Sequence, residues 1–149
     1  MNNQPVTGFR FIHQWVEYTA QNNPNAIAVN DGSIFSYSQL NSDASGLANT
    51  LFENGVRQGN CVGVCLPRSY DLMVSILAIL KTGAAYVPFD PEYPADRLNY
   101  MADTANVKTM VANQAMKSAL PKGNFSIVDV ATKSTSSSNL IALDEAKHT

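Results

Sequence analysis

The sequence predicts an α/β fold, a mainly parallel sheet with helices flanking it. Three observations lead to this class. Short β-rich segments alternate along most of the chain with segments whose apolar residues recur at helical spacing. The segment 61–66, "CVGVCL", is almost wholly apolar, as a strand covered on both faces is. Glycines and prolines stand where the patterns change, which places turns between the elements.

Length and composition favour one folded domain with a core of its own. The chain has 149 residues, of which 45% are hydrophobic, and a formal net charge of −2. No basic patch is visible, so nothing indicates nucleic acid or a membrane as a partner. The N-terminal residues lack the apolar core of a signal peptide, and the apolar run at 72–80 is too short to cross a bilayer. We therefore expect a cytoplasmic protein.

The first part of the chain predicts a helix, a hairpin and a second helix. Residues 9–22 carry apolar side chains at helical spacing, and a strand at 26–30 turns at Asp31-Gly32 into a second arm at 33–35. Ser36 and Gln39 have the spacing of a capping box, and Phe35 and Leu40 that of a hydrophobic staple. A helix should therefore begin at Ser36. Its apolar face is formed by Leu40, Ala44, Leu47, Ala48 and Leu51, and it ends at Gly55.

The second part repeats the alternation of strand and helix. Further strands are predicted at 61–66, 84–90, 107–112 and 125–130. Between them we expect one helix capped by Ser69 and ended by Gly83, one with Pro94 at its first position, and a short one at 113–120. Their predicted apolar stripes are Met73, Ile76, Leu77 and Leu80 for the first, and Leu98, Met101, Ala102 and Ala105 for the second. Pro88 marks an edge strand.

The polar and sulfur-containing residues each have a structural interpretation. Cys61 and Cys65 lie about 13 Å apart along one strand, beyond the roughly 7 Å that a disulfide spans, so we expect two free thiols in the core. Ser36 and Ser69 are interpreted as helix caps, and Lys81 as a cation at a helix C-terminus. The remaining candidates are Asp71 in a first helical turn, Asp90 in the turn "DPEYP", and Asp96 and Asp103, which form no close pair.

The sequence contains no motif that carries a reaction by itself. Neither GxxxxGK[ST] nor GxGxxG is present, and no serine lies in a nucleophile elbow. His13 is expected on the surface of the first helix and His148 in the C-terminal tail, so no metal site is predicted. We assign no catalytic, cofactor-binding or metal-binding residue.

A long stretch of the chain resembles a known family. "LKTGAAYVPFDPEYPADRLNYM" is similar to the second core motif of the adenylation domains of nonribosomal peptide synthetases. "FSYSQLN" resembles the first core motif, with serine and glutamine for the usual threonine and glutamate. "VGVCLPRSYDLMVSILAILK" matches the segment between them, and "WVEYTAQNNPNAIAV" resembles the opening helix.

The resemblance implies an adenylate-forming enzyme of the acyl-CoA synthetase and luciferase group. Such enzymes use ATP and Mg²⁺ to convert a carboxylic acid into an acyl-adenylate, and then pass the acyl group to the phosphopantetheine of a carrier protein. This chain corresponds to the first part of their large N-terminal domain. We expect residues 1–149 to form a partial adenylation domain, with an ordered core at about 9–130 and a loop or tail at 131–149. We also expect no condensation domain before the first helix.

The family's later motifs, which handle ATP and substrate, find no match here. Pro121-Lys122-Gly123 lacks the Thr-, Ser- and Gly-rich run that precedes such a triplet in the family, and "TKSTSSSN" contains no glycine. No catalytic residue can therefore be transferred to this chain. Three interpretations remain: an N-terminal piece that is inactive alone, half of a split enzyme completed by a partner chain, or a non-catalytic binding or regulatory module on the same scaffold.

Overall fold

The computed structural model describes residues 12–120 and 125–131. Within these residues the chain forms a four-stranded sheet in the order β4-β3-β5-β6 and a separate two-stranded hairpin, β1-β2. Every pair of neighbouring strands in the larger sheet is parallel, and the hairpin is antiparallel. The predicted α/β class with a mainly parallel sheet and flanking helices is confirmed.

The elements follow the predicted order. The strands are β1 (Ile27–Asn30), β2 (Ile34–Ser36), β3 (Cys61–Cys65), β4 (Ala85–Pro88), β5 (Thr109–Ala112) and β6 (Ser126–Asp129). The helices are α1 (Ile12–Asn22), α2 (Tyr37–Glu53), α3 (Tyr70–Lys81), α4 (Ala95–Thr104) and the short 3₁₀ helix η2 (Gln114–Ala119). Among the described residues, none of the helices has the length and apolarity that a membrane span needs.

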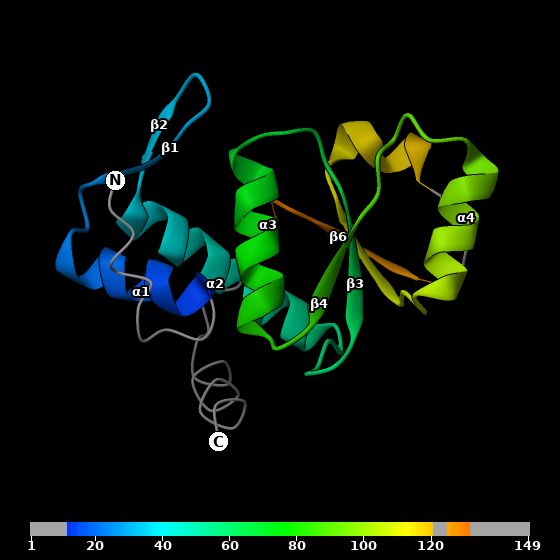
Figure 1. Cartoon of the computed structure of the whole chain (residues 1–149), viewed down its shortest axis with the longest axis horizontal. Helices are drawn as coiled ribbons and strands as arrows, with labels where there is room; N and C mark the ends of the chain where they lie inside the picture. Colours follow the sequence, from blue (N-terminus) through cyan, green and yellow to red (C-terminus); the bar gives the residue numbers. More distant parts are fainter. Residues whose placement is uncertain (1–11, 121–124, 132–149) are drawn as a thin grey trace.

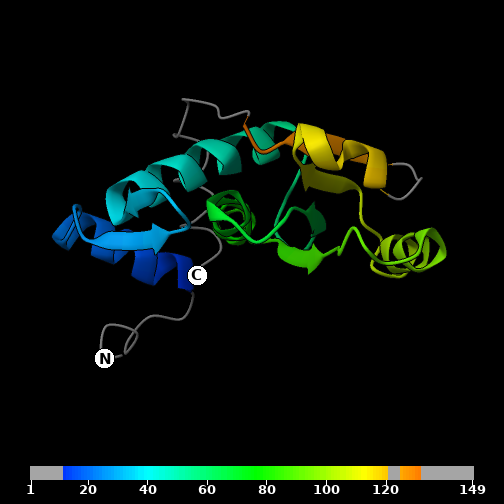
Figure 2. The ribbon, with the colours of Figure 1, turned by 90° about the horizontal axis from the view of Figure 1, so that it is seen from above.

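Strand β3 separates two apolar cores, because successive side chains along a strand point to opposite faces of the sheet. Val62 and Val64 belong to the core shared with α2 and α3. Gly63 faces the other core, where an added Cβ would lie 2.7 Å from Met110 Sδ and 2.8 Å from Phe89 Cε1. Only glycine leaves room for this contact. Figures 1 and 2 show α3 on one side of the sheet and α4 on the other.

Helix α2 begins and ends as the sequence predicts. The Ser36 side chain accepts a hydrogen bond from the Gln39 amide at 3.1 Å, which satisfies one of the amides left free at a helix start. At the other end Gly55 has a φ of +95°, and the Val56 amide donates to the Leu51 carbonyl at 3.0 Å. This is the Schellman arrangement that a C-terminal glycine allows. The five side chains predicted for its apolar face are all buried.

Helix α3 is buried along a different stripe from the predicted one. Met73 is 42% exposed, and Ile76 and Leu80 are only half-buried, so of the predicted set only Leu77 is fully buried. The buried side chains are Tyr70, Val74, Ser75, Leu77, Ala78, Ile79 and Lys81. The helix is apolar on most of its circumference and packs against both α2 and the sheet. Periodicity alone could not identify the buried faces of such a helix.

One smaller prediction needs correction, and another is confirmed with its helix type specified. Pro94 is the N-cap of α4 rather than its first helical residue, so the helix begins at Ala95. The short helix predicted at 113–120 is a 3₁₀ helix capped by Asn113. Leu98 and Ala102 are buried on α4 as predicted, and Pro88 does lie in an edge strand.

The Ser36 cap gives a stability prediction. Ser36→Ala removes the bond to the Gln39 amide and should lower the free energy of unfolding by about 1 kcal/mol. Ser38→Ala is the matched control, because Ser38 is exposed within the same helix and alanine is a good helix former. Urea unfolding followed by circular dichroism measures both. Equal midpoints for Ser36→Ala and the unchanged chain would show that the cap does not contribute.

Candidate functional site

The carboxyl ends of parallel strands are where α/β folds usually bind ligands. In this chain that edge is formed by the segments that follow Cys65, Pro88, Ala112 and Asp129. The sequence places several polar side chains in these segments. Their hydrogen bonds show whether each is free to bind a ligand.

Asp90 is exposed at this edge and shapes its own turn. Its carboxylate accepts a hydrogen bond from the Glu92 amide at 2.9 Å, and its carbonyl accepts one from the Tyr93 amide at 3.0 Å. The structural interpretation of "DPEYP" is thereby supported. The carboxylate also acts on Cys65, whose pKa is raised, first by burial and then by the negative charge of Asp90.

Ser69 caps the helix after β3. Its side-chain oxygen accepts a hydrogen bond from the Leu72 amide at 3.2 Å and donates one to the Pro67 carbonyl at 2.9 Å. Asp71 lies in the first turn of the same helix, where an acid is favourable. The predicted roles of Ser69 and Asp71 are confirmed, and both are structural.

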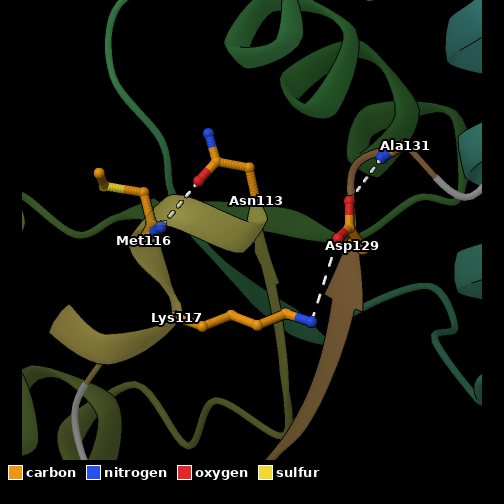
Figure 3. A network of polar contacts seen from close by, with 5 residues as sticks. All are labelled: Asn113, Met116, Lys117, Asp129 and Ala131. Carbon is orange, nitrogen blue, oxygen red and sulfur yellow. Dashed lines mark hydrogen bonds and ion pairs between the residues drawn. The ribbon is translucent and has the colours of Figure 1, made fainter.

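A third polar cluster joins η2 to the end of β6 (Figure 3). Asn113 Oδ1 accepts a hydrogen bond from the Met116 amide at 2.8 Å, and Asp129 Oδ1 accepts one from the Ala131 amide at 2.9 Å. Lys117 Nζ lies 4.0 Å from Asp129 Oδ2, with both side chains partly exposed. Such a pair contributes little to stability. The acceptors of this cluster are thus used by the loops that carry them.

In the described part of the chain, the glycines with positive φ, which phosphate-binding loops use, lie away from the carboxyl edge. Among the described residues, no group of three His, Cys, Asp or Glu side chains could hold a metal ion. The described glycines with positive φ, at positions 32, 55, 59 and 83, lie in the hairpin turn and at the amino edge of the sheet. Pro121-Lys122-Gly123, the serine-rich segment 132–139 and His148 lie outside the described residues.

His13 is placed differently from its prediction, and Lys81 has a partner that the sequence did not indicate. His13 is buried at 1% exposure, because α1 packs against α2 and α3 on this side. Lys81 lies in the last turn of α3, as predicted, but its side chain is buried and forms an ion pair with Glu17 of α1. The pair therefore joins the first helix to the third. No pattern within a helix identifies a partner 64 residues away.

The hairpin is fixed to α3 by contacts that the sequence did not reveal. Asp31 Oδ2 accepts a hydrogen bond from the Tyr70 amide at 2.8 Å, so the hairpin turn caps the start of α3. The Tyr70 hydroxyl donates to Asp43 Oδ2 of α2 at 2.6 Å, and its ring stacks on Phe35 at a centroid distance of 3.6 Å. Burial, followed by the bond to Asp43, raises the pKa of Tyr70 far above its ordinary value. The phenol stays protonated and acts as a donor.

A pocket of about 460 Å³ lies at the opposite, amino edge of the sheet. The ends of α2 and α4 and the starts of β3, β5 and β6 line it. Several of its residues are polar, and Cys61 is among them. No sequence pattern indicates this pocket, because its lining comes from five segments that are separated along the chain.

The family follows from the matched residues. Residues 16–148 match the model of the AMP-binding enzyme family, so the chain belongs to that family. Bacitracin synthase 1 of Bacillus licheniformis is 36% identical over 118 residues, which are 78% of this chain and 2% of that protein. Tyrocidine synthase 1 of Brevibacillus parabrevis is 37% identical over 113 residues, or 75% and 10% of the two chains. The chain therefore spans a small part of the relatives it matches.

The matching solved structures indicate which part of an adenylation domain this chain resembles. The nonribosomal peptide synthetase FmoA3 is 26% identical with a TM-score of 0.77, covering 85% of this chain and 15% of that one. The N-terminal subdomain of Klebsiella oxytoca NpsA shares the fold, with a TM-score of 0.75 over 88% of this chain and 33% of that one, at 22% identity. The chain matches the N-terminal region of nonribosomal peptide synthetase adenylation domains, as the core-motif resemblance predicted.

The two free cysteines give a reactivity prediction. Cys65 is buried and its thiol pKa is raised, so little thiolate forms near neutral pH, whereas Cys61 is only half-buried and lines the amino-edge pocket. A thiol reagent such as an aromatic disulfide should modify Cys61 in the folded chain and Cys65 only in denaturant. Mass spectrometry after timed quenching locates the label. The modification seen in the folded chain should persist in Cys65→Ala and disappear in Cys61→Ala. Equal rates of modification at both thiols would contradict the assignment.

Proposed function

We propose that the chain is the N-terminal part of an adenylation domain of a nonribosomal peptide synthetase. Its role in adenylation is to provide a scaffold, and the reacting groups come from residues outside this sequence. Alone it does not activate a carboxylic acid. No residue of the chain is assigned a catalytic, cofactor or metal role.

One observation carries this proposal: the polar side chains at the carboxyl edge serve local structure. Asp90 shapes its turn, Ser69 caps α3, and Asn113 caps η2. Adenylation needs ATP held in line with the carboxylate, and charge on the departing pyrophosphate must be neutralised by a metal ion and cations. The described residues form the carboxyl edge of the sheet, but they do not bring together the metal ligands and cations that this reaction needs.

The partners and small molecules belong to the complete domain. We infer that the chain works with the remainder of an adenylation domain, with ATP and Mg²⁺ as in its family, and with phosphopantetheine on a carrier protein. FmoA3 has been solved with α-methyl-L-serine-AMP and with AMPPNP, and NpsA in an artificial fusion of adenylation and PCP domains. These structures support the inference. The ordered core at about 9–130 and the loop or tail at 131–149 remain predictions.

A second function is favoured by exposed apolar side chains on α3 and on the edge strand β4. Tyr86 on β4 pairs with Val62, so it lies on the sheet face that α3 covers, and it is 42% exposed. Met73 on α3 is exposed to the same extent. We call these two residues the α3–β4 surface. Such a surface suits half of a split enzyme that a partner chain completes, whereas a non-catalytic module would need no such completion.

Exchange of pyrophosphate into ATP tests the proposed function. The purified chain should show no exchange above background with any proteinogenic amino acid, because it lacks the phosphate and metal ligands. Exchange by the chain alone would overturn the proposal and direct attention to Lys122, with Lys122→Ala as the test. Exchange that appears only when a second chain carrying the later motifs is added would establish the split enzyme.

The α3–β4 surface gives a separate prediction. The purified chain should bind a hydrophobic dye or self-associate, and the double variant Met73→Gln, Tyr86→Gln should reduce both effects without lowering the melting temperature. Tyr100→Gln is the control, because Tyr100 is 70% exposed on α4, across the sheet from α3. Light scattering and dye fluorescence measure the outcome. A monodisperse monomer with weak dye binding would instead support a self-contained module.

A further inference from the structure

We draw no further inference here: the strongest candidate, the surface of the β1–β2 hairpin that exposes Ile27 and Ile34, carries none, because nothing in the described part of the structure shows what covers it.

Discussion

The fold depends on the burial of β3 on both of its faces. Its side chains divide between two cores, so the sequence of the strand sets what can pack on each side. Val62 and Val64 fill the side of α2 and α3, while Gly63 lets Met110 and Phe89 approach the strand backbone on the side of α4. One five-residue strand therefore contributes to both of the cores in which the helices pack.

The same constraint explains why α3 has polar anchors at both ends. A helix that packs against the sheet and two other helices must be fixed in rotation, and apolar contacts alone specify rotation weakly when most of the surface is apolar. At its start the Tyr70 amide binds Asp31, and at its end Lys81 pairs with Glu17. An ion pair of this kind, with Lys81 buried and Glu17 partly exposed, adds little net stability when it is compared with apolar packing, but the loss of the partner of the buried lysine is costly. We infer that these two contacts fix the rotational orientation of α3 against the sheet and the neighbouring helices.

The stretch "GAAYVPFDPEYP" contains residues whose side chains or backbone angles shape the chain. Gly83 ends α3 with a positive φ, β4 runs along the sheet edge, and Asp90 closes the turn that leads into α4. The residue types at Gly83 and Asp90 are thus explained by backbone geometry. Membership of the AMP-binding enzyme family does not by itself locate catalysis in these residues.

The sequence by itself determined the α/β class, the order of the elements, the caps at Ser36 and Ser69 and the helix end at Gly55, because these depend on residues close together in the chain. The tertiary structure alone decided which stripe of α3 is buried, that His13 is inside, and that Lys81 meets Glu17. It also brought the lining of the amino-edge pocket together. These features depend on contacts between distant segments, and the repeat of a helix or strand carries no information about its partners.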